Sequence, residues 1–382
     1  MRDGQALVGT LRWMASSGRR GAGPRQMSAV VVGALFGGVI VVATVLAVVT
    51  VVVRQSTDVP GVDTSRPSPE LTSAAAMRMR SASGFTTVGT YAIGTSRLEV
   101  VEAGAAGGTG RRVLPTTVWY PARRSPGVGG GRADPDRAHG PYPLVVFSQG
   151  YDLSIDAYAP LLVALASAGF VVAAPAYPHT SPSGSGALDE SDITNHPADL
   201  RAVITTVLEL ARASGSLLSG LIDVHEVGVV GHSDGGDVAL AVAADSCCRD
   251  QRVKAAVILS GAELTSFGGA YFSAGAPPLL VTQGSADAIN PPACSAQIYD
   301  NAASPKYYLD LLGAQHKKPY VSAGPDREIV SRVIAEFLDG ELAGQMSALT
   351  TLTHDGNVAG RSRLSHAAFA PRAAGGCPGA PG

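Results

Sequence analysis

The chain has 382 residues, of which 46% are hydrophobic and 16% are charged, and its net charge is −2. This composition excludes broad disorder, and a charge near zero gives no global basic field for binding nucleic acid. The 46 glycines and 25 prolines follow no triplet period, which excludes collagen, and four cysteines are too few for a disulfide-dense scaffold.

The first patterned segment is apolar. Ser28 to Val53 holds 26 residues without a charge, and about 20 helical residues cross the hydrocarbon core of a bilayer. A cleavable signal peptide has a shorter apolar run of roughly 7–15 residues followed by small residues, which is not the pattern here. Five arginines precede the run and one follows it directly. Because basic flanks stay in the cytoplasm, we expect a single-pass plasma-membrane protein with its N-terminus inside and the remainder outside.

These patterns divide the chain into five parts. A cytoplasmic basic segment covers 1–27, the transmembrane anchor 28–53 and a Ser/Thr/Pro-rich linker 54–85. One domain at 86–342 is long enough for a substantial core, and 343–382 reads as a flexible C-terminal tail.

The central domain alternates β-rich runs with helical patterns. This alternation predicts an α/β fold with a mostly parallel sheet flanked by helices. The run Pro143 to Phe147 is continuously apolar, as in a strand buried on both faces. The expected strands cover 116–120, 143–147, 170–175, 227–231, 253–259, 278–282 and 307–312, and the expected helices cover about 157–167, 197–208, 238–243 and 328–338, with another opening near 290–292.

A short motif after the strand at 227–231 points to chemistry. Residues 231–236 read GHSDGG, which matches G-x-S-x-G between a buried strand and a helix rich in Ala and Val. Such a turn holds its serine in a strained backbone geometry that flanking glycines permit, and the hydroxyl projects above the sheet. Ser233 is therefore the predicted nucleophile. The alternative is an ordinary Gly/Ser turn.

A serine hydroxyl needs a base, which in turn needs an acid to orient it. In this kind of fold the chain order is Ser, acid, His. Asp287 and His316 each follow a predicted strand, so both belong to the sheet edge where Ser233 lies. Glu263 is a rival acid, and Asp310 lies inside a strand. We predict Asp287 and His316 as the partners of Ser233.

Two backbone N–H groups are the candidate oxyanion donors. One belongs to Asp234, which follows the nucleophile, and the other to Tyr151, in the loop after the strand that ends at Phe147. A carboxylate near a developing oxyanion opposes its formation, so we expect the Asp234 side chain to point away and cap the helix. The loop 178–196 is expected to frame the substrate cleft.

Five short segments carry a family resemblance. They are VVFSQGY at 145–151, NHPADL at 195–200, GHSDGG at 231–236, the Gly284/Asp287/Pro291 segment and GAQH at 313–316. The chain resembles the α/β-hydrolase superfamily over about 86–342. Within it, the chain looks like the group of cutinase-like polyester hydrolases, platelet-activating-factor acetylhydrolases and chlorophyllases. In the polyester hydrolases an aromatic wall residue follows the oxyanion glycine, a place that Tyr151 takes here.

These observations predict a membrane-anchored extracytoplasmic serine hydrolase that cleaves carboxylic esters of lipids, small molecules or polyesters through an acyl-enzyme. Its partners would be the ester substrate and the membrane, and no nucleic acid, cofactor or metal is implied. Two alternatives remain. One is an acyltransferase with the same triad, and the other is a catalytically inactive α/β-hydrolase fold that serves as a binding module.

The four cysteines form two groups along the chain. Cys247 and Cys248 are adjacent, and Cys294 and Cys377 lie downstream. Disulfides persist outside the cytoplasm, and the sequence does not fix which pairs form. We favour a bridge between Cys294 and one of the adjacent pair.

Overall fold

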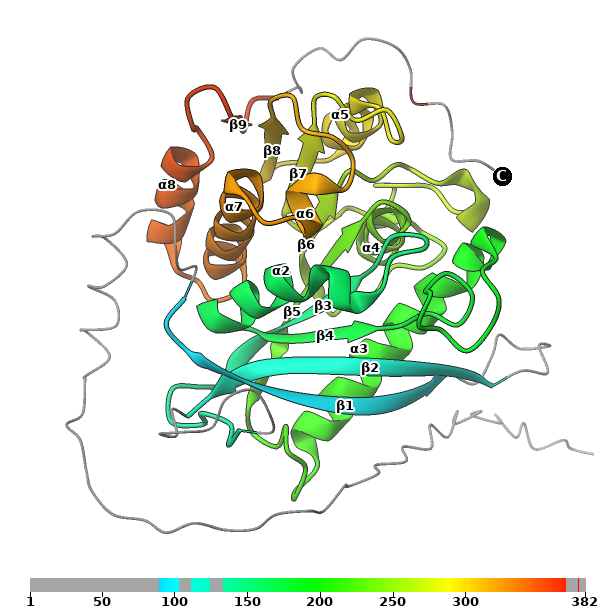
Figure 1. Cartoon of the computed structure of the whole chain (residues 1–382), viewed down its shortest axis with the longest axis vertical. Coiled ribbons are helices and arrows are strands. Elements are labelled where there is room, and N and C mark those ends of the chain that lie inside the picture. The colour runs from blue at the N-terminus through cyan, green and yellow to red at the C-terminus, as the bar shows by residue number, and fades with distance from the viewer. Residues whose placement is uncertain (1–88, 103–110, 124–132, 369–376, 378–382) are drawn as a thin grey trace, which may run out of the picture. The chain divides into compact units, whose positions relative to one another are not determined.

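In the computed structural model, the described residues are 89–102, 111–123, 133–368 and 377 (Figure 1). The predicted basic segment 1–27, the anchor 28–53 and the linker 54–85 lie outside these residues. Within the described ranges, no helix combines the length and the apolar character that a membrane crossing requires.

The described strands form one nine-stranded sheet, which is mostly parallel. Its order is β1-β2-β4-β3-β5-β6-β7-β8-β9. The strands from β4 to β8 run parallel, and β1, β2 and β9 pair antiparallel at the two edges. The bounds are β1 Ala92–Glu102, β2 Arg112–Ala122, β3 Tyr142–Ser148, β4 Val171–Pro175, β5 Ile222–His232, β6 Val253–Leu259, β7 Leu279–Gly284, β8 Lys306–Leu311 and β9 Ser362–Ser365.

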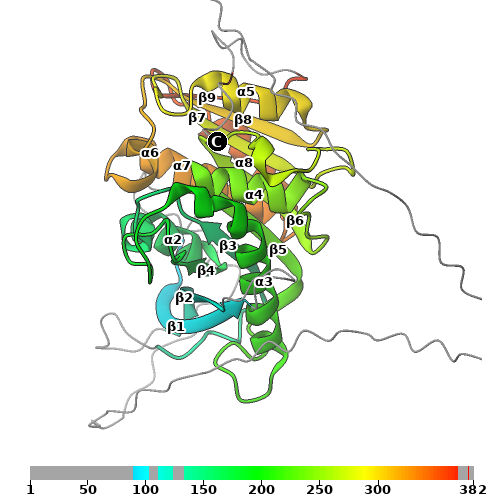
Figure 2. The same cartoon turned by 90° about the vertical axis from the view of Figure 1, so that its right-hand side faces the viewer.

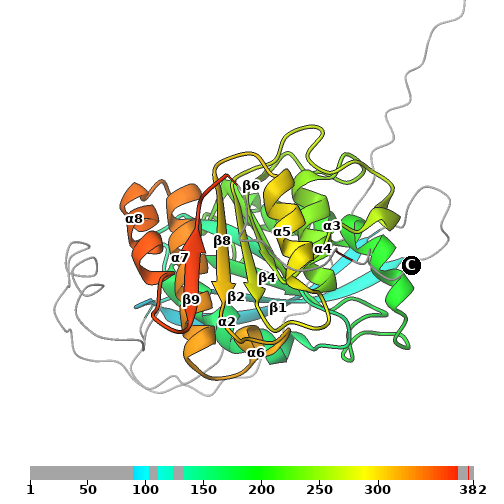
Figure 3. The same ribbon diagram turned by 90° about the horizontal axis from the view of Figure 1, so that it is seen from above.

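Helices cover both faces of the sheet, as the alternating pattern predicted. Buried side chains of α3, α4 and α5 pack on one face, and those of α2, α6, α7 and α8 pack on the other (Figure 3). Figure 2 shows α2 and α3 on opposite sides of β3 and β4. The bounds are α2 Ile155–Ala168, α3 His196–Arg212, α4 Asp234–Ala244, α5 Pro292–Asn301, α6 Lys318–Val321, α7 Pro325–Glu341 and α8 Met346–Asp355, with 3₁₀ turns η2 Glu190–Asn195 and η3 Thr265–Phe267.

The central strands are buried on both faces. All seven residues of β3 are buried, and so is the C-terminal half of β5. Helix α4, which follows β5, is built from small residues and is almost wholly buried, so it packs closely on the sheet. The continuous apolar runs in the sequence therefore become the strands that carry the candidate site, and the predicted α/β fold with a mostly parallel sheet flanked by helices is confirmed for the described residues.

Both edges of the sheet differ from the sequence prediction. The stretch expected to be a flexible tail contains α8, which packs against α7, and β9, which pairs with β8. The chain is therefore structured beyond Leu342, as far as the end of β9. At the other edge, β1 was not predicted, because its burial pattern is irregular and its residues are mostly half-buried. Short or irregular edge strands carry a weak periodic signal, and pairing with a neighbour decides them.

The favoured disulfide pairing is wrong. Cys247 pairs with Cys248, and Cys294 pairs with Cys377. The adjacent cysteines lie in the turn after α4, whereas Cys294 is buried in the first turn of α5. Cys377 reaches Cys294 with a Cα–Cα distance of 4.5 Å, a contact over 83 residues of sequence that local patterns do not reveal.

Candidate active site

Ser233 lies at the turn between β5 and α4. Its backbone has φ 56°, in the region that residues with a side chain rarely adopt. The flanking glycines make the turn possible. A Cβ on Gly231 would lie 1.9 Å from the carbonyl oxygen of Gly235, and a Cβ on Gly235 would lie 2.1 Å from that of Ser148. The G-x-S-x-G spacing thus follows from close backbone packing around the serine.

His316 lies between Ser233 and Asp287. Its Nε2 is 2.8 Å from Ser233 Oγ, and its Nδ1 is 2.8 Å from Asp287 Oδ2. Because a carboxylate accepts, Nδ1–H is the donor, which leaves Nε2 as the acceptor that faces the serine hydroxyl. The three side chains come from the ends of β5, β7 and β8, and all three residues are at most 8% exposed. The structure therefore brings together the three residues that the sequence grouped.

Asp287 is held in its ionised form. Burial is the largest single influence and would raise its pKa, but the hydrogen bond and the charge interaction with His316, the backbone N–H of Ile289 and Gln283 together outweigh it. The pKa of Asp287 is therefore lowered. A carboxylate in this state fixes the orientation of the imidazole and stabilises its cation.

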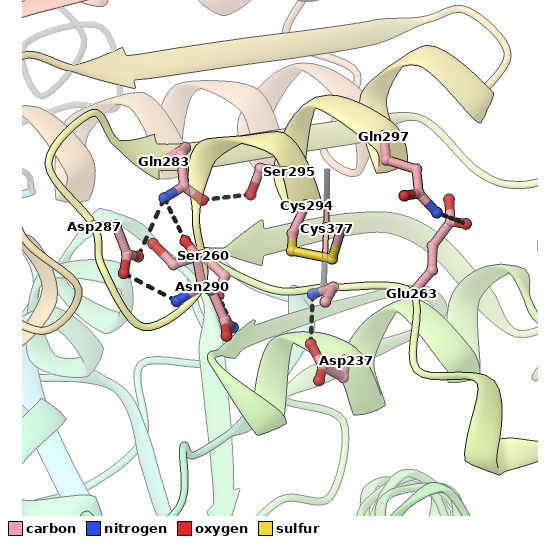
Figure 4. The surroundings of a disulfide bond; sticks show 11 residues. Asp237, Ser260, Glu263, Gln283, Asp287, Asn290, Cys294, Ser295, Gln297 and Cys377 are labelled. Atoms are coloured by element: carbon pink, nitrogen blue, oxygen red, sulfur yellow. Dashed lines mark hydrogen bonds between the residues drawn. A yellow bond between two sulfur atoms is a disulfide. The ribbon is translucent and has the colours of Figure 1, made fainter. Parts of the chain in front are cut away.

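Gln283 is a supporting residue that sequence reasoning missed. It is fully buried at the end of β7, and its Nε2 donates to Asp287 Oδ2 and to the carbonyl of Asn290 (Figure 4). Its Oε1 accepts a hydrogen bond of 2.6 Å from Ser295, in the first half of α5. The loop between β7 and α5, which carries Asp287, is called the acid loop below. Gln283 thus ties the acid loop to α5. A polar residue at the end of a buried strand was the available signal.

The rival acids lie elsewhere. Glu263 accepts hydrogen bonds from Gln297 and Asn301, on α5 and away from His316. Asp310 lies within β8, where it faces Arg363 of β9 in the strand register. Neither carboxyl takes the place that Asp287 occupies beside His316.

Tyr151 and Asp234 face the same cavity as Ser233 and His316. The cavity has a volume of about 390 Å³ and is also lined by residues of the 178–196 loop, as expected. The turn around Ser233, between β5 and α4, is called the elbow below. The backbone of Gly150 passes close to the elbow, since a Cβ on Gly150 would lie 3.1 Å from Ser233 Cβ. The loop after β3 therefore lies beside the serine, with Tyr151 as its next residue.

The Asp234 side chain does not behave as expected. Asp234 lines the cavity, and its Oδ2 is buried without a hydrogen-bond partner among the described residues, so it caps no helix. Asp234 directly follows Ser233 in the turn, and the next residue, Gly235, packs closely against the backbone of Ser148. Burial, assisted by the charge of Glu190, raises the pKa of Asp234 to about 6.

An ion-pair cluster holds one wall of the cavity. Within the η2 turn, Asp192 receives two hydrogen bonds from Arg112 on β2. The same guanidinium binds Asp199 at the start of α3. Glu190 and Thr194, from this turn, line the cavity. Arg112 therefore joins β2 to the wall segment, a contact over 80 residues that the sequence did not predict.

The described residues hold no group of three or more His, Cys, Asp or Glu side chains arranged for a metal ion. The Ser233 hydroxyl and the His316 imidazole line the cavity, and the Asp287 carboxylate binds the imidazole at its other nitrogen. This arrangement can activate a serine oxygen for attack on an electrophilic carbon.

One comparison with known proteins covers the first part of this site. A model of the chlorophyllase family matches residues 133–261, which include Gly150, Tyr151 and the whole elbow around Ser233. The resemblance to the chlorophyllase-like group of α/β-hydrolases is confirmed. The match covers about a third of the chain and supports a hydrolase that acts on esters. No curated protein sequence shows significant similarity to the chain.

Proposed function

We propose that the chain is a serine hydrolase that cleaves carboxylic esters. The observation that carries this proposal is the position of His316, whose two ring nitrogens lie 2.8 Å from Ser233 Oγ and 2.8 Å from Asp287 Oδ2. A base within hydrogen-bond reach of both a nucleophile and an orienting carboxylate is the arrangement that nucleophilic catalysis by serine requires.

In the first half-reaction, Ser233 Oγ attacks the carbonyl carbon of the ester while its proton moves to His316 Nε2. The tetrahedral adduct then collapses as the bond to the alcohol oxygen breaks, and His316 gives the proton to that oxygen. The products are an acyl-enzyme on Ser233 and the free alcohol. Asp287 keeps its charge throughout and stabilises the imidazolium.

In the second half-reaction, water replaces the alcohol. His316 takes a proton from the water as the water oxygen attacks the acyl carbon. His316 then returns the proton to Ser233 Oγ when the acid leaves. The backbone N–H groups of Tyr151 and Asp234 are the proposed oxyanion donors in both steps. Support comes from their position on the cavity beside Ser233 and from the start of α4 at Asp234, where the helix dipole favours negative charge.

The proposed location is the outer side of a membrane, with 28–53 as the anchor. The uncharged run and its basic flank support an anchor and its orientation. Two disulfides among the described residues support an oxidising compartment, because such bridges are rare in the cytosol. Fractionation of cells that express the full chain tests the anchor. A variant that lacks 1–53 should leave the membrane fraction, and persistence there would contradict it.

The activity is tested by release of p-nitrophenol from short- and medium-chain acyl esters by the full chain. Ser233→Ala should lower kcat by at least about 10³-fold with the fold unchanged. Ser331→Ala is the matched control, because Ser331 is also buried but lies on α7. Equal turnover by wild type and Ser233→Ala would refute the proposal.

A further inference from the structure

A second histidine lies at the elbow and takes no part in the proton transfers described above. His232 is the last residue of β5, directly before Ser233, and it is fully buried. Its Nδ1 is 2.7 Å from the hydroxyl of Tyr158, which lies on α2. Its Nε2 is 3.0 Å from the backbone carbonyl oxygen of His316. Both ring nitrogens are therefore hydrogen-bonded, each to a different part of the chain.

The directions of these hydrogen bonds are fixed by their partners. The carbonyl of His316 can only accept, so His232 donates through Nε2–H. The Tyr158 oxygen accepts a hydrogen bond of 3.2 Å from the backbone N–H of Gly150, and its own proton therefore points to Nδ1 of His232. Burial, assisted by the nearby His316, lowers the pKa of His232 to about 3, so the ring is neutral.

The bonds run in one direction through four segments, which are the loop after β3, α2, the end of β5 and the loop after β8. Gly150 N–H donates to Tyr158, Tyr158 O–H donates to His232, and His232 Nε2–H donates to the His316 carbonyl. Gly150 precedes Tyr151 in the loop after β3. His316 belongs to the loop after β8, and His232 is bonded covalently to Ser233. The chain of hydrogen bonds therefore begins in the proposed oxyanion loop, passes the elbow and ends in the loop of the base.

The hydrogen-bonded chain from Gly150 through Tyr158 and His232 to His316 is called the link below, and close packing restricts its movement. A Cβ on Gly150 would lie 3.2 Å from His232 Nδ1 and 3.1 Å from the His232 carbonyl oxygen. The His232 ring lies 4.7 Å from the ring of Tyr320 and 4.8 Å from that of His316, measured between centroids. Because interiors are close-packed, a neutral ring in this place holds its neighbours at fixed distances.

We propose that Tyr158 and His232 are positioning residues that set the distance between the oxyanion loop and the base, with Ser233 between them. This inference rests on the proposed ester hydrolysis, since its effect is felt in the reaction at Ser233. The link touches no substrate. It acts on the peptide that precedes the Tyr151 N–H and on the backbone of His316. These two groups must be in place when charge develops on the carbonyl oxygen of the ester. Loss of the link should therefore lower kcat more than it raises KM.

The kinetic test compares Tyr158→Phe with Tyr320→Phe in the full chain. Tyr320 is also fully buried and its ring also contacts His232, but its hydroxyl binds Ser260 and Thr282 and belongs to no part of the link. Tyr158→Phe should lower kcat about tenfold with KM within about twofold of wild type, whereas Tyr320→Phe should keep both within about twofold. Unchanged kcat in a folded Tyr158→Phe variant would overturn the proposal, as would equal losses in the two variants.

Non-additivity gives a second kinetic readout. His232→Phe keeps a flat ring but removes both hydrogen bonds, so it breaks the link completely. The double variant Tyr158→Phe/His232→Phe should therefore have the kcat of His232→Phe within about twofold. A double variant whose loss is the product of the two single losses would show that the two side chains act independently, contrary to the proposal.

A measurement on the wild-type chain separates this inference from the activity. In protein labelled with ¹⁵N-histidine, the ring that contacts Tyr320 is expected to show the neutral Nε2–H form from pH 5 to pH 9. An Nδ1–H form, or titration within this range, would overturn the link even if the variants fail to fold. If no ester is hydrolysed and no fluorophosphonate reacts, the proposed function fails, and this spectrum alone decides whether the link exists.

Discussion

Two carboxyl groups lie close to the candidate nucleophile, and their surroundings are opposite. Asp287, in the loop after β7, accepts four hydrogen bonds, from His316, Gln283 and the backbone N–H groups of Ile289 and Asn290. Asp234, in the turn after β5, has a buried oxygen without a partner among the described residues. The pKa of Asp287 is lowered despite its burial, whereas burial raises that of Asp234 to about 6.

The difference shows that hydrogen bonds, more than depth, decide which carboxyl stays charged. Burial disfavours the charge of both groups, but only the acid loop supplies donors that reverse the effect. The acid loop can therefore keep a stable negative charge beside an imidazole. The elbow instead carries a carboxyl that loses its charge just below neutral pH. Four changes, given in order of decreasing expected effect, test this contrast.

The largest effect is expected from Asp287→Asn. The amide can donate as well as accept, so His316 loses the partner that fixes its tautomer, and kcat should fall by about 10⁴-fold. Asp310→Asn is the control, because Asp310 is a half-buried carboxyl on β8 without a bond to His316. Both variants are assayed with the p-nitrophenyl esters. Similar losses in the two variants would remove the distinction drawn here for Asp287.

The helices that follow the two carboxyls also differ in their disulfides. Cys294, on α5 after the acid loop, is joined to Cys377 over 83 residues, whereas Cys247 and Cys248, after α4, are adjacent. A long closed loop restricts the unfolded chain far more than a bond between neighbours. Replacing Cys294 and Cys377 by serine should cost about 4 kcal/mol of unfolding free energy in urea. The same change at the adjacent pair should cost much less, and equal losses would contradict a stabilisation that depends on loop length.

Asp234→Asn should stabilise the fold at high pH. The folded pKa of about 6 lies above the ordinary 3.8, so the native state binds more protons between these values and wild-type stability falls as pH rises through them. The variant escapes this fall, and its gain should reach about 3 kcal/mol at pH 8 and about 1 kcal/mol at pH 4.5.

Urea unfolding at the two pH values measures the gain from Asp234→Asn. Asp156→Asn, which changes an exposed carboxyl on α2, serves as the control. A gain that is the same at pH 4.5 and pH 8 would show that the Asp234 carboxyl carries no extra proton in the folded protein.

The smallest effect is expected from Gln283→Leu. The change removes one of the four donors to Asp287 and the link to Ser295, while the other three donors remain. We expect kcat to fall about tenfold, less than for Asp287→Asn, because the carboxylate is kept but held less firmly. Gln297→Leu, on the exposed side of α5, is the control. A fall as large as that of Asp287→Asn would mean that the other donors contribute little.

The sequence was most informative where a signal is local. The elbow around Ser233 shows a buried strand, paired glycines and a small-residue helix within a few residues, and Asp287 and His316 each follow an apolar run. Since the carboxyl ends of parallel strands meet at one edge of a sheet, the sequence alone is enough to group these residues. The structure places them within hydrogen-bond distance of one another.

Long-range contacts could not be predicted in the same way. Arg112 meets Asp199 across 87 residues, and Cys294 meets Cys377 across 83, so no local pattern marks either pair. Strand β9 has four residues, which are too few for a periodic signal. Its extended conformation depends on pairing with β8. The burial of Asp234 Oδ2 without a partner among the described residues follows from packing around the turn, which no local sequence pattern marks.

The most direct test of the central claim is the intact mass of the full chain after reaction with a fluorophosphonate. Such a probe phosphonylates an activated serine and releases fluoride. We expect a single adduct, located on Ser233 by peptide mapping and absent from Ser233→Ala, with the Ser331→Ala control still labelled. A wild-type chain that stays unlabelled, or an adduct that persists in Ser233→Ala, would contradict the assignment of Ser233 as the nucleophile.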